Sequence, residues 1–404
     1  MKKSLILASL LLAVGKATAQ EKENYKIANL PYYSYKKGLG VTSPDSLYQV
    51  NIRFRMKKRL EANFDDDKAI EYKGNIRDIR LRFDGYAIDP RFLYSLQLSF
   101  TPEEIGKLDN KDVLNIIRDA VVFYQATNKL SIGFGQTKLP GNRQKINSSG
   151  ALNLTDRSIN SAMFNIDRDF GFQAVYSNQK ENDFGYDIKM AISTGHGRNS
   201  TQKRTGLAYT GRLELYPLGK FKKNGVFFEG DLVREQTPKL YLGATYHHNQ
   251  NAGKSQGQIG TALFEGRDLN SVLIDALLKY KGWAGSLSYM SRTTDNPLTF
   301  NPKYTVGSNL QELNFVRVGH GYDAQLSYNF PSNLEIIGRY SFNNPHKDIE
   351  KYLPQQEQIT FGVTKYLWEH LFKIQLEVSK NNFKYFDGRK DDNWYARFQI
   401  EFGI

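Results

Sequence analysis

Hydrophobic and polar residues alternate along most of the chain. In residues 394–402, WYARFQIEF, apolar side chains from Trp394 to Phe402 occupy one face, whereas Arg397 and Glu401 lie on the other. A period of two residues is that of a β-strand whose two faces meet different surroundings. The pattern predicts a strand without saying which face looks inward, because a soluble sandwich and a membrane barrel give opposite answers.

Similar alternating segments recur to the end of the chain, which is the weak sequence signature of barrel strands. We expect sixteen strands, near residues 48–57, 76–87, 91–100, 119–126, 129–137, 170–178, 184–194, 205–216, 239–248, 271–281, 283–292, 320–329, 334–343, 357–366, 372–380 and 394–402. An even number of strands is typical of a closed antiparallel barrel in the outer membrane.

The connections between these segments alternate in length. Short ones lie at 88–90, 127–129, 281–283, 331–333 and 368–370. Long ones lie near 58–75, 101–118, 138–169, 195–204, 249–270, 293–319, 344–356 and 381–393. The exception is 217–238, which is long where a short turn is due, and its VFFEGDL stretch suggests a local hairpin arm. Outer-membrane barrels separate short periplasmic turns from long outer loops, whereas sandwiches do not.

The polar faces carry many charges, as Arg53 and Arg55 in VNIRFRM (50–56) illustrate. Such faces cannot fill a sandwich core, because an unpaired buried charge is strongly unfavourable. They could face water on a soluble sheet, or a wet lumen in a barrel. Aromatic residues at strand ends favour the barrel: Tyr176, Tyr216, Tyr246, Tyr280, Tyr328 and Tyr366. The sequence thus predicts an all-β, transmembrane antiparallel barrel of about sixteen strands, whose apolar faces touch lipid and whose lumen is aqueous.

The N-terminus indicates export. Lys2 and Lys3 precede a short apolar run from Leu5 to Val14, and Ala17-Thr18-Ala19 forms an A-x-A cleavage site. We interpret residues 1–19 as a signal peptide, 20–46 as a periplasmic lead-in and 47–404 as the barrel, placed in the outer membrane of a Gram-negative bacterium. The chain has no Cys, which excludes disulfides and thiolate chemistry, and a net charge of +13.

The expected lumen faces are nearly balanced in charge. The bases are Arg53, Arg55, Arg80, Arg82, Lys189, Arg212, Lys279, Arg339, Lys373 and Arg397. The acids are Asp78, Asp84, Asp187, Glu214, Asp275, Asp323, Glu335, Glu377 and Glu401. Cross-strand ion pairs that stabilise the barrel explain this balance, so the wall composition alone does not predict anion selectivity.

The long segment 138–169 combines bases with apolar residues. Its bases are Lys138, Arg143, Lys145, Arg157 and Arg168, and its apolar residues are Ile146, Leu152, Leu154, Ile159, Met163 and Phe164. A loop in solvent needs no such apolar residues, whereas one folded against the inner wall does. We therefore expect this third outer loop to fold inward, to narrow the pore and to meet anions with its bases. The alternative is a surface loop with solvated charges.

Four motifs carry a family resemblance. GQTKLP (135–140), LTDRS (154–158), DRDFG (167–171) and GRYSF (338–342) resemble the phosphate-selective porin O/P family. The resemblance implies a sixteen-stranded, trimeric outer-membrane channel with its third outer loop folded inward, and it matches Lys138, Arg157 and Arg168 to the loop motif. The chain departs from the family where acids interrupt the basic wall, and where Gly403 and Ile404 follow Phe402.

The predicted function is passive diffusion of small hydrophilic solutes, with a preference for anions such as phosphate. The predicted ion path comprises Lys138, Arg143, Lys145, Arg157, Arg168, Arg53, Arg55, Arg80, Arg82, Arg212, Arg339 and Arg397. Expected partners are membrane lipids, small anions and two further copies in a homotrimer, with no nucleic acid. No cofactor or metal is expected, and the scattered His residues and missing G-x-S-x-G motif argue against an enzyme. A general or sugar-permeable porin and a non-conducting surface barrel, either an adhesin or an assembly platform, remain alternatives.

Overall fold

The structure is a computed structural model that describes residues 38–65, 69–101, 115–303 and 312–404. The expected signal peptide and residues 20–37 of the lead-in lie outside these ranges. Within them, no helix is long and apolar enough to cross a bilayer.

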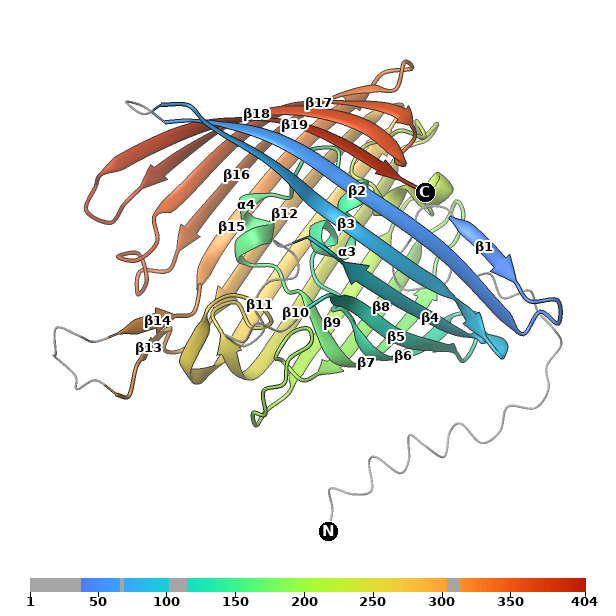
Figure 1. The fold of residues 1–404 in the computed structure, drawn as a ribbon, viewed down its shortest axis with the longest axis horizontal. Helices are drawn as coiled ribbons and strands as arrows, with labels where there is room; N and C mark the ends of the chain where they lie inside the picture. Colours follow the sequence, from blue (N-terminus) through green and yellow to red (C-terminus); the bar gives the residue numbers. More distant parts are fainter. Residues whose placement is uncertain (1–37, 66–68, 102–114, 304–311) are drawn as a thin grey trace, which may run out of the picture.

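Sixteen strands of the described chain form a closed antiparallel barrel, in which each strand pairs with its neighbours in the ring and β19 pairs with β2 (Figure 1). The ring consists of β2 (Tyr48–Phe64), β3 (Glu71–Ala87), β4 (Asp89–Ser99), β5 (Ile117–Gln125), β6 (Leu130–Lys138), β7 (Arg168–Asn178), β8 (Gly185–Ser193), β9 (Ala208–Tyr216), β10 (Lys239–Lys254), β11 (Ala262–Tyr280), β12 (Trp283–Thr293), β15 (Gly319–Asn329), β16 (Leu334–Pro345), β17 (Gln355–Trp368), β18 (Phe372–Lys384) and β19 (Lys390–Gly403). The predicted fold class and strand number are confirmed.

Several strands run further than the sequence predicted. β2 and β3 continue into the expected 58–75 connection, and β10 and β11 into 249–270, so the connections there shrink to 65–70 and 255–261. In β10 and β11 the extensions carry polar residues on both faces, which hides the alternation that marks a strand, while backbone pairing continues. The β2 extension keeps the alternation, with Leu60 and Phe64 exposed and Arg59 buried. Within the 294–318 connection, β13 (Leu298–Phe300) and β14 (Leu313–Phe315) form a separate two-stranded sheet. Side-chain hydrogen bonds join this hairpin to β11.

A short additional strand, β1 (Leu39–Thr42), lies beside the start of β2. It pairs with residues 49–52, whereas β19 reaches only as far as Arg55. β1 thus covers backbone groups that the last strand leaves unpaired. Four residues of the expected lead-in thus belong to a strand that pairs with the barrel.

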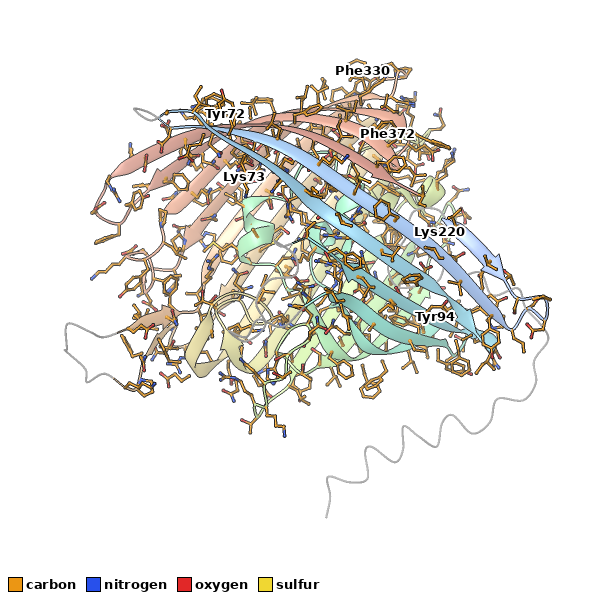
Figure 2. All side chains as sticks on the ribbon, in the orientation of Figure 1. Tyr72, Lys73, Tyr94, Lys220, Phe330 and Phe372 are labelled. Atoms are coloured by element: carbon orange, nitrogen blue, oxygen red, sulfur yellow. The ribbon has the colours of Figure 1, made fainter. Side chains whose placement is uncertain are left out.

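The apolar faces of the strands point outward, as expected. Trp394 and Phe398 of β19 are 44% and 38% exposed, whereas Glu401 on the other face is fully buried. Figure 2 shows the aromatic residue Tyr72 at one end of the barrel and Tyr94, Phe330 and Phe372 toward the other. Exposed aromatics at both ends of the apolar surface are typical of interfacial girdles.

Two of the six tyrosines named at strand ends point to the inner face of the barrel and not toward lipid. Tyr216 and Tyr366 are 1% and 2% exposed, and their hydroxyls donate to carboxylates inside the barrel. Each shares the parity of polar inner residues on its own strand, such as Glu214 for Tyr216 and Thr364 for Tyr366. The alternation, rather than the position at a strand end, decides where they point.

The connection 217–238 forms no hairpin, contrary to expectation. It contains the 3₁₀ helix η3 (Lys222–Phe227), and Phe221 and Val226 pack against Tyr216, Tyr241 and Leu277 on the inner face of the wall. Burial of these apolar side chains explains why the chain needs more residues here than a tight turn.

The connection between β6 and β7 is another long segment with short helices. It includes α3 (Arg143–Ile146), the 3₁₀ helix η2 (Ser149–Ala151) and α4 (Ile159–Met163), and we call residues 139–167 the β6–β7 segment (Figure 1). Leu139, Met163, Phe164 and Ile166 pack on a buried cluster of wall residues formed by Ala191, Leu273 and Met290. Met163 and Phe164, two of the apolar residues that distinguished this segment in the sequence, are thus buried against strands distant in the chain.

Candidate functional site

The β6–β7 segment is held by side chains from most of the wall. Near its start, Thr245 donates to the Pro140 carbonyl over 3.0 Å, and Asn142 donates to Ser288 over 2.7 Å. The Asn142 side chain also caps α3 by accepting from the amide of Gln144. A helix of one turn has little stability alone, so the cap and these wall contacts fix its place.

Ser149 is the centre of the contacts to β2 and β3. Its hydroxyl accepts from Arg55 over 2.7 Å and from Arg80 over 2.5 Å, and it donates to Asp78 over 3.0 Å. Lys57 donates to the Ser149 carbonyl over 2.7 Å. Ser149 therefore supplies hydrogen-bond partners to charged side chains that would otherwise be buried without replacing their bonds to water.

Gly150 allows this close approach. A Cβ atom there would collide with Arg55 Nη1 and would lie 2.8 Å from Glu401 Oε1. Glycine lets the segment backbone run directly against the charged wall.

Wall carboxylates hold the far part of the segment. Glu335 accepts from the Asn153 amide group over 3.0 Å, and Glu377 accepts from the Thr155 backbone over 2.8 Å. Asp323 accepts from Ser158 over 2.8 Å and from Asn160 over 2.9 Å. Wall bases donate to segment carbonyls in the same region: Lys373, Arg59, Arg339 and Arg292.

The balanced wall charges thus serve two purposes. Some form the expected cross-strand pairs, such as Lys189 with Glu214 at 2.6 Å and Arg212 with Asp275 at 2.9 Å. Many others bind the β6–β7 segment. Sequence reasoning missed this second use because backbone carbonyl and amide partners leave no trace in residue identity.

The bases of the segment itself are mostly engaged in holding it. Arg143 donates to the Val226 and Phe228 carbonyls, each over 3.3 Å, and Lys145 pairs with Asp167 at 2.8 Å. Burial lowers the pKa of Lys145, and the Asp167 carboxylate opposes that effect.

Arg157 and Arg168 are also held. Arg157 donates to the carbonyls of Gln144 and Asn147, and its burial lowers its pKa. Arg168 forms a two-bonded ion pair with Asp119. A guanidinium held in this way has fewer donors left for a passing solute.

One cavity brings together six of the predicted basic groups, Arg168 among them, and the short turn after β17 contributes to its lining. Its volume is about 120 Å³. The basic side chains that line it within the described chain are Arg53, Arg55, Arg80, Arg82, Lys138 and Arg168. The lining carboxylates there are Asp119 and Glu401. Asp84 pairs with Arg53 and Arg82 from the wall behind them. Even with Asp78 and Asp84 counted, bases outnumber acids.

Several apolar and aromatic residues that line the cavity come from connections. Phe227 and Phe228 belong to the 217–238 connection, His370 and Leu371 to the turn after β17, and Ile146 to α3. Sequence reasoning singled out Ile146 but missed the other four residues, because irregular segments have no period. The unexpected length of 217–238 was the available signal.

The predicted ion path therefore divides in two. Arg53, Arg55, Arg80, Arg82, Lys138 and Arg168 line one cavity. Arg143, Lys145, Arg157, Arg212, Arg339 and Arg397 lie elsewhere, in hydrogen bonds or ion pairs with the chain.

Comparison with known proteins agrees with this architecture. The family model described as "Phosphate-selective porin O and P" matches residues 49–226, somewhat less than half of the chain. The resemblance suggested by the sequence motifs is confirmed over this part. No curated protein matches the chain.

Solved porin structures share the fold at low identity. OmpF of Salmonella typhi, in complex with daunomycin, is 12% identical, with a TM-score of 0.54 and coverage of 91% of this chain and 100% of that one. The channel DcaP of Acinetobacter baumannii is 12% identical, with a TM-score of 0.53 and coverage of 90% and 99%. An anion-selective porin from Comamonas acidovorans is 11% identical, with a TM-score of 0.51 and coverage of 88% and 99%.

The fold defined by the closed ring is that of an outer-membrane porin barrel. Among porins, the family whose model matches the first half of the barrel is the one described as phosphate-selective porin O and P.

Proposed function

We propose that the chain is a passive outer-membrane diffusion channel that prefers small anions, phosphate among them. The observation that carries the proposal is the cavity in which six basic side chains face two carboxylates. A water-filled site of this charge attracts anions and repels cations, and Arg favours phosphate because its planar fork binds two oxygens at once.

In this proposal, the β6–β7 segment folds into the lumen as the third outer loop and narrows the pore. Its hydrogen bonds to inner-face residues of β3, β11, β15, β16 and β18 support that placement. The anion-contacting groups are then the lining bases of β2, β3, β6 and β7. Arg143, Lys145 and Arg157 act mainly by holding the segment in position.

The transport step needs no covalent chemistry. An anion exchanges part of its water shell for hydrogen bonds from guanidinium and ammonium groups, and its concentration gradient drives passage. The carboxylates Asp119 and Glu401 beside the bases keep binding weak enough for release. A channel conducts when solutes both enter and leave its binding sites readily.

The cellular setting belongs to the same proposal. Residues 1–19 direct export, the barrel lies in the outer membrane of a Gram-negative bacterium, and three copies assemble through their apolar outer faces. The exposed apolar band and its aromatic ends support contact with lipid.

The test is the reversal potential of the full-length protein in planar bilayers under a potassium chloride gradient. We expect a potential of the sign given by chloride preference, and competition by added phosphate. Cation preference would reject the proposal, and absence of any preference would favour a general porin. No solute entry in a liposome swelling assay would favour a non-conducting surface barrel.

A further inference from the structure

The basic cavity has two chemically different sides. One side consists of charged groups on the strands, of which Arg53, Arg82 and Lys138 are examples. The other consists of Phe227, Phe228, Ile146 and Leu371, which come from α3 and two connections. Inorganic phosphate has no apolar group and can use only the first side.

The apolar side is rigidly supported. The Phe228 ring stacks on the His370 ring with centroids 4.2 Å apart, and the Tyr366 ring meets His370 edge-on at 5.0 Å. The carbonyls of Val226 and Phe228 accept from Arg143, which fastens this connection to the β6–β7 segment. Preorganised aromatic surfaces bind an apolar partner without an ordering penalty on the protein.

His370 adds no positive charge to this side near neutral pH. Burial, with the nearby charges of Lys373 and Lys279, lowers the pKa of His370 well below its ordinary value of 6.5. The imidazole therefore stays neutral. It extends the aromatic surface of Phe228 and adds nothing to the basic lining of the cavity.

Size limits the apolar group to a single ring at most. The cavity volume is about 120 Å³, and an apolar cavity of roughly 150 Å³ in another protein binds benzene. An anion with an aromatic group could place its charged head against the guanidinium groups and its ring against Phe227 and Phe228.

We propose that this cavity selects small organic anions in which a phosphate or carboxylate is joined to an aromatic or other apolar group, in preference to inorganic phosphate. This inference rests on the proposed anion channel and names the class of solute that its cavity fits best. The head group supplies attraction to the bases, and ring burial supplies the additional selectivity.

The experiment compares three phosphates as blockers of chloride current through the full-length channel in planar bilayers at pH 8. The probes are phenyl phosphate, methyl phosphate and inorganic phosphate, which share the same head group and differ in the attached group. We expect the half-blocking concentration of phenyl phosphate to be about tenfold below that of the other two. Equal half-blocking concentrations for phenyl and methyl phosphate would overturn the inference.

Variants separate the ring contact from the charge. Phe227→Ala should bring phenyl phosphate to the level of methyl phosphate, whereas Phe227→Tyr, which keeps the ring, should retain the difference. If Phe227→Ala does not assemble, the comparison of the three probes on the parent channel still decides. Cation preference of the parent channel would instead reject the proposed function itself.

Discussion

The Arg168 guanidinium forms a bidentate ion pair with the Asp119 carboxylate, in which Nε donates to Oδ1 and Nη2 donates to Oδ2, both over 3.0 Å. Both residues line the basic cavity, and both are buried. Asp119 also accepts from Thr137 over 3.0 Å, so both of its carboxylate oxygens accept hydrogen bonds from the chain. The pair links the end of the β6–β7 segment to β5, and its carboxylate lowers the positive charge that the cavity presents.

Replacing Asp119 with Asn should therefore increase anion preference while weakening the fold. The substitution removes a lining negative charge and leaves Arg168 with the more distant Asp167, at 3.5 Å, as its counter-ion. Breaking a buried ion pair on one side costs about 3–5 kcal/mol of stability. The permeability ratio of chloride to potassium and the urea midpoint of unfolding from lipid vesicles measure the two effects. Asp187→Asn is the control, since this buried β8 acid does not line the cavity; an unchanged ratio in a folded D119N channel would contradict the assignment.

Neutralising a cavity base should have the opposite effect on selectivity. Arg82 lines the cavity and lies 3.5 Å from Asp84, so Arg82→Gln should move the reversal potential toward zero. Arg397 has a similarly small exposure and a carboxylate partner, Glu61, but does not line the cavity. We expect Arg397→Gln to leave the reversal potential unchanged. Equal shifts in the two variants would show that selectivity is spread along the whole wall.

A methyl group at position 150 should displace the segment from β2. The Ala side chain in Gly150→Ala would collide with Arg55 Nη1, so Arg55 or the segment must move. We expect altered single-channel conductance with noisier open levels, and a loss of stability of about 1–3 kcal/mol, the usual penalty for overpacking. Gly211→Ala on β9 is the matched control, because no atom lies within 4 Å of the added carbon. Identical conductance in both variants would argue against the tight fit at Ser149 and Gly150.

Acid should loosen the β6–β7 segment. Burial opposes ionisation of Asp167, but the charges of Lys145 and Arg168 outweigh it and lower the Asp167 pKa well below 3.8. The folded state therefore binds fewer protons at this carboxyl than the unfolded state. Its stabilising contribution is complete above about pH 4 and is lost as the pH falls through the folded pKa.

Amide hydrogen exchange of the segment between pH 7 and pH 3, corrected for intrinsic rates, measures this change. We expect protection in 139–167 to fall below about pH 4 while protection in the strands persists. Asp167→Asn should show reduced protection at every pH and a weaker dependence on acid. Constant protection of the parent segment down to pH 3 would mean that Asp167 does not hold it.

The strands and their faces were largely predictable because alternation reports directly on two different surroundings. Arg80, Arg82 and Asp84 of β3 all lie on the inner face that their spacing predicts. The assignment of Tyr216 failed where position at a strand end was given more weight than parity. Parity is the stronger guide, since successive strand residues must point to opposite sides.

The grouping of bases was not predictable in the same way. Arg82 and Arg212 occupy equivalent inner positions in the sequence pattern, yet one lines the cavity and the other is enclosed by Glu214, Tyr241 and Asp275. The difference depends on how the strands are shifted relative to one another around the barrel, and on which connection packs beside each arginine. Neither is encoded in the spacing within one strand.

The position of the cavity beside the pairing of β2 with β19 links permeation to assembly. Arg53 and Arg55 come from the first strand of the ring, whereas Gly403 and Ile404 come from the last. The lining is complete only after these two strands have met and the ring has closed. A barrel whose ring has not closed therefore lacks the complete basic lining. Ion-selective current should then appear only after folding is complete, so that it can serve as a probe of folding.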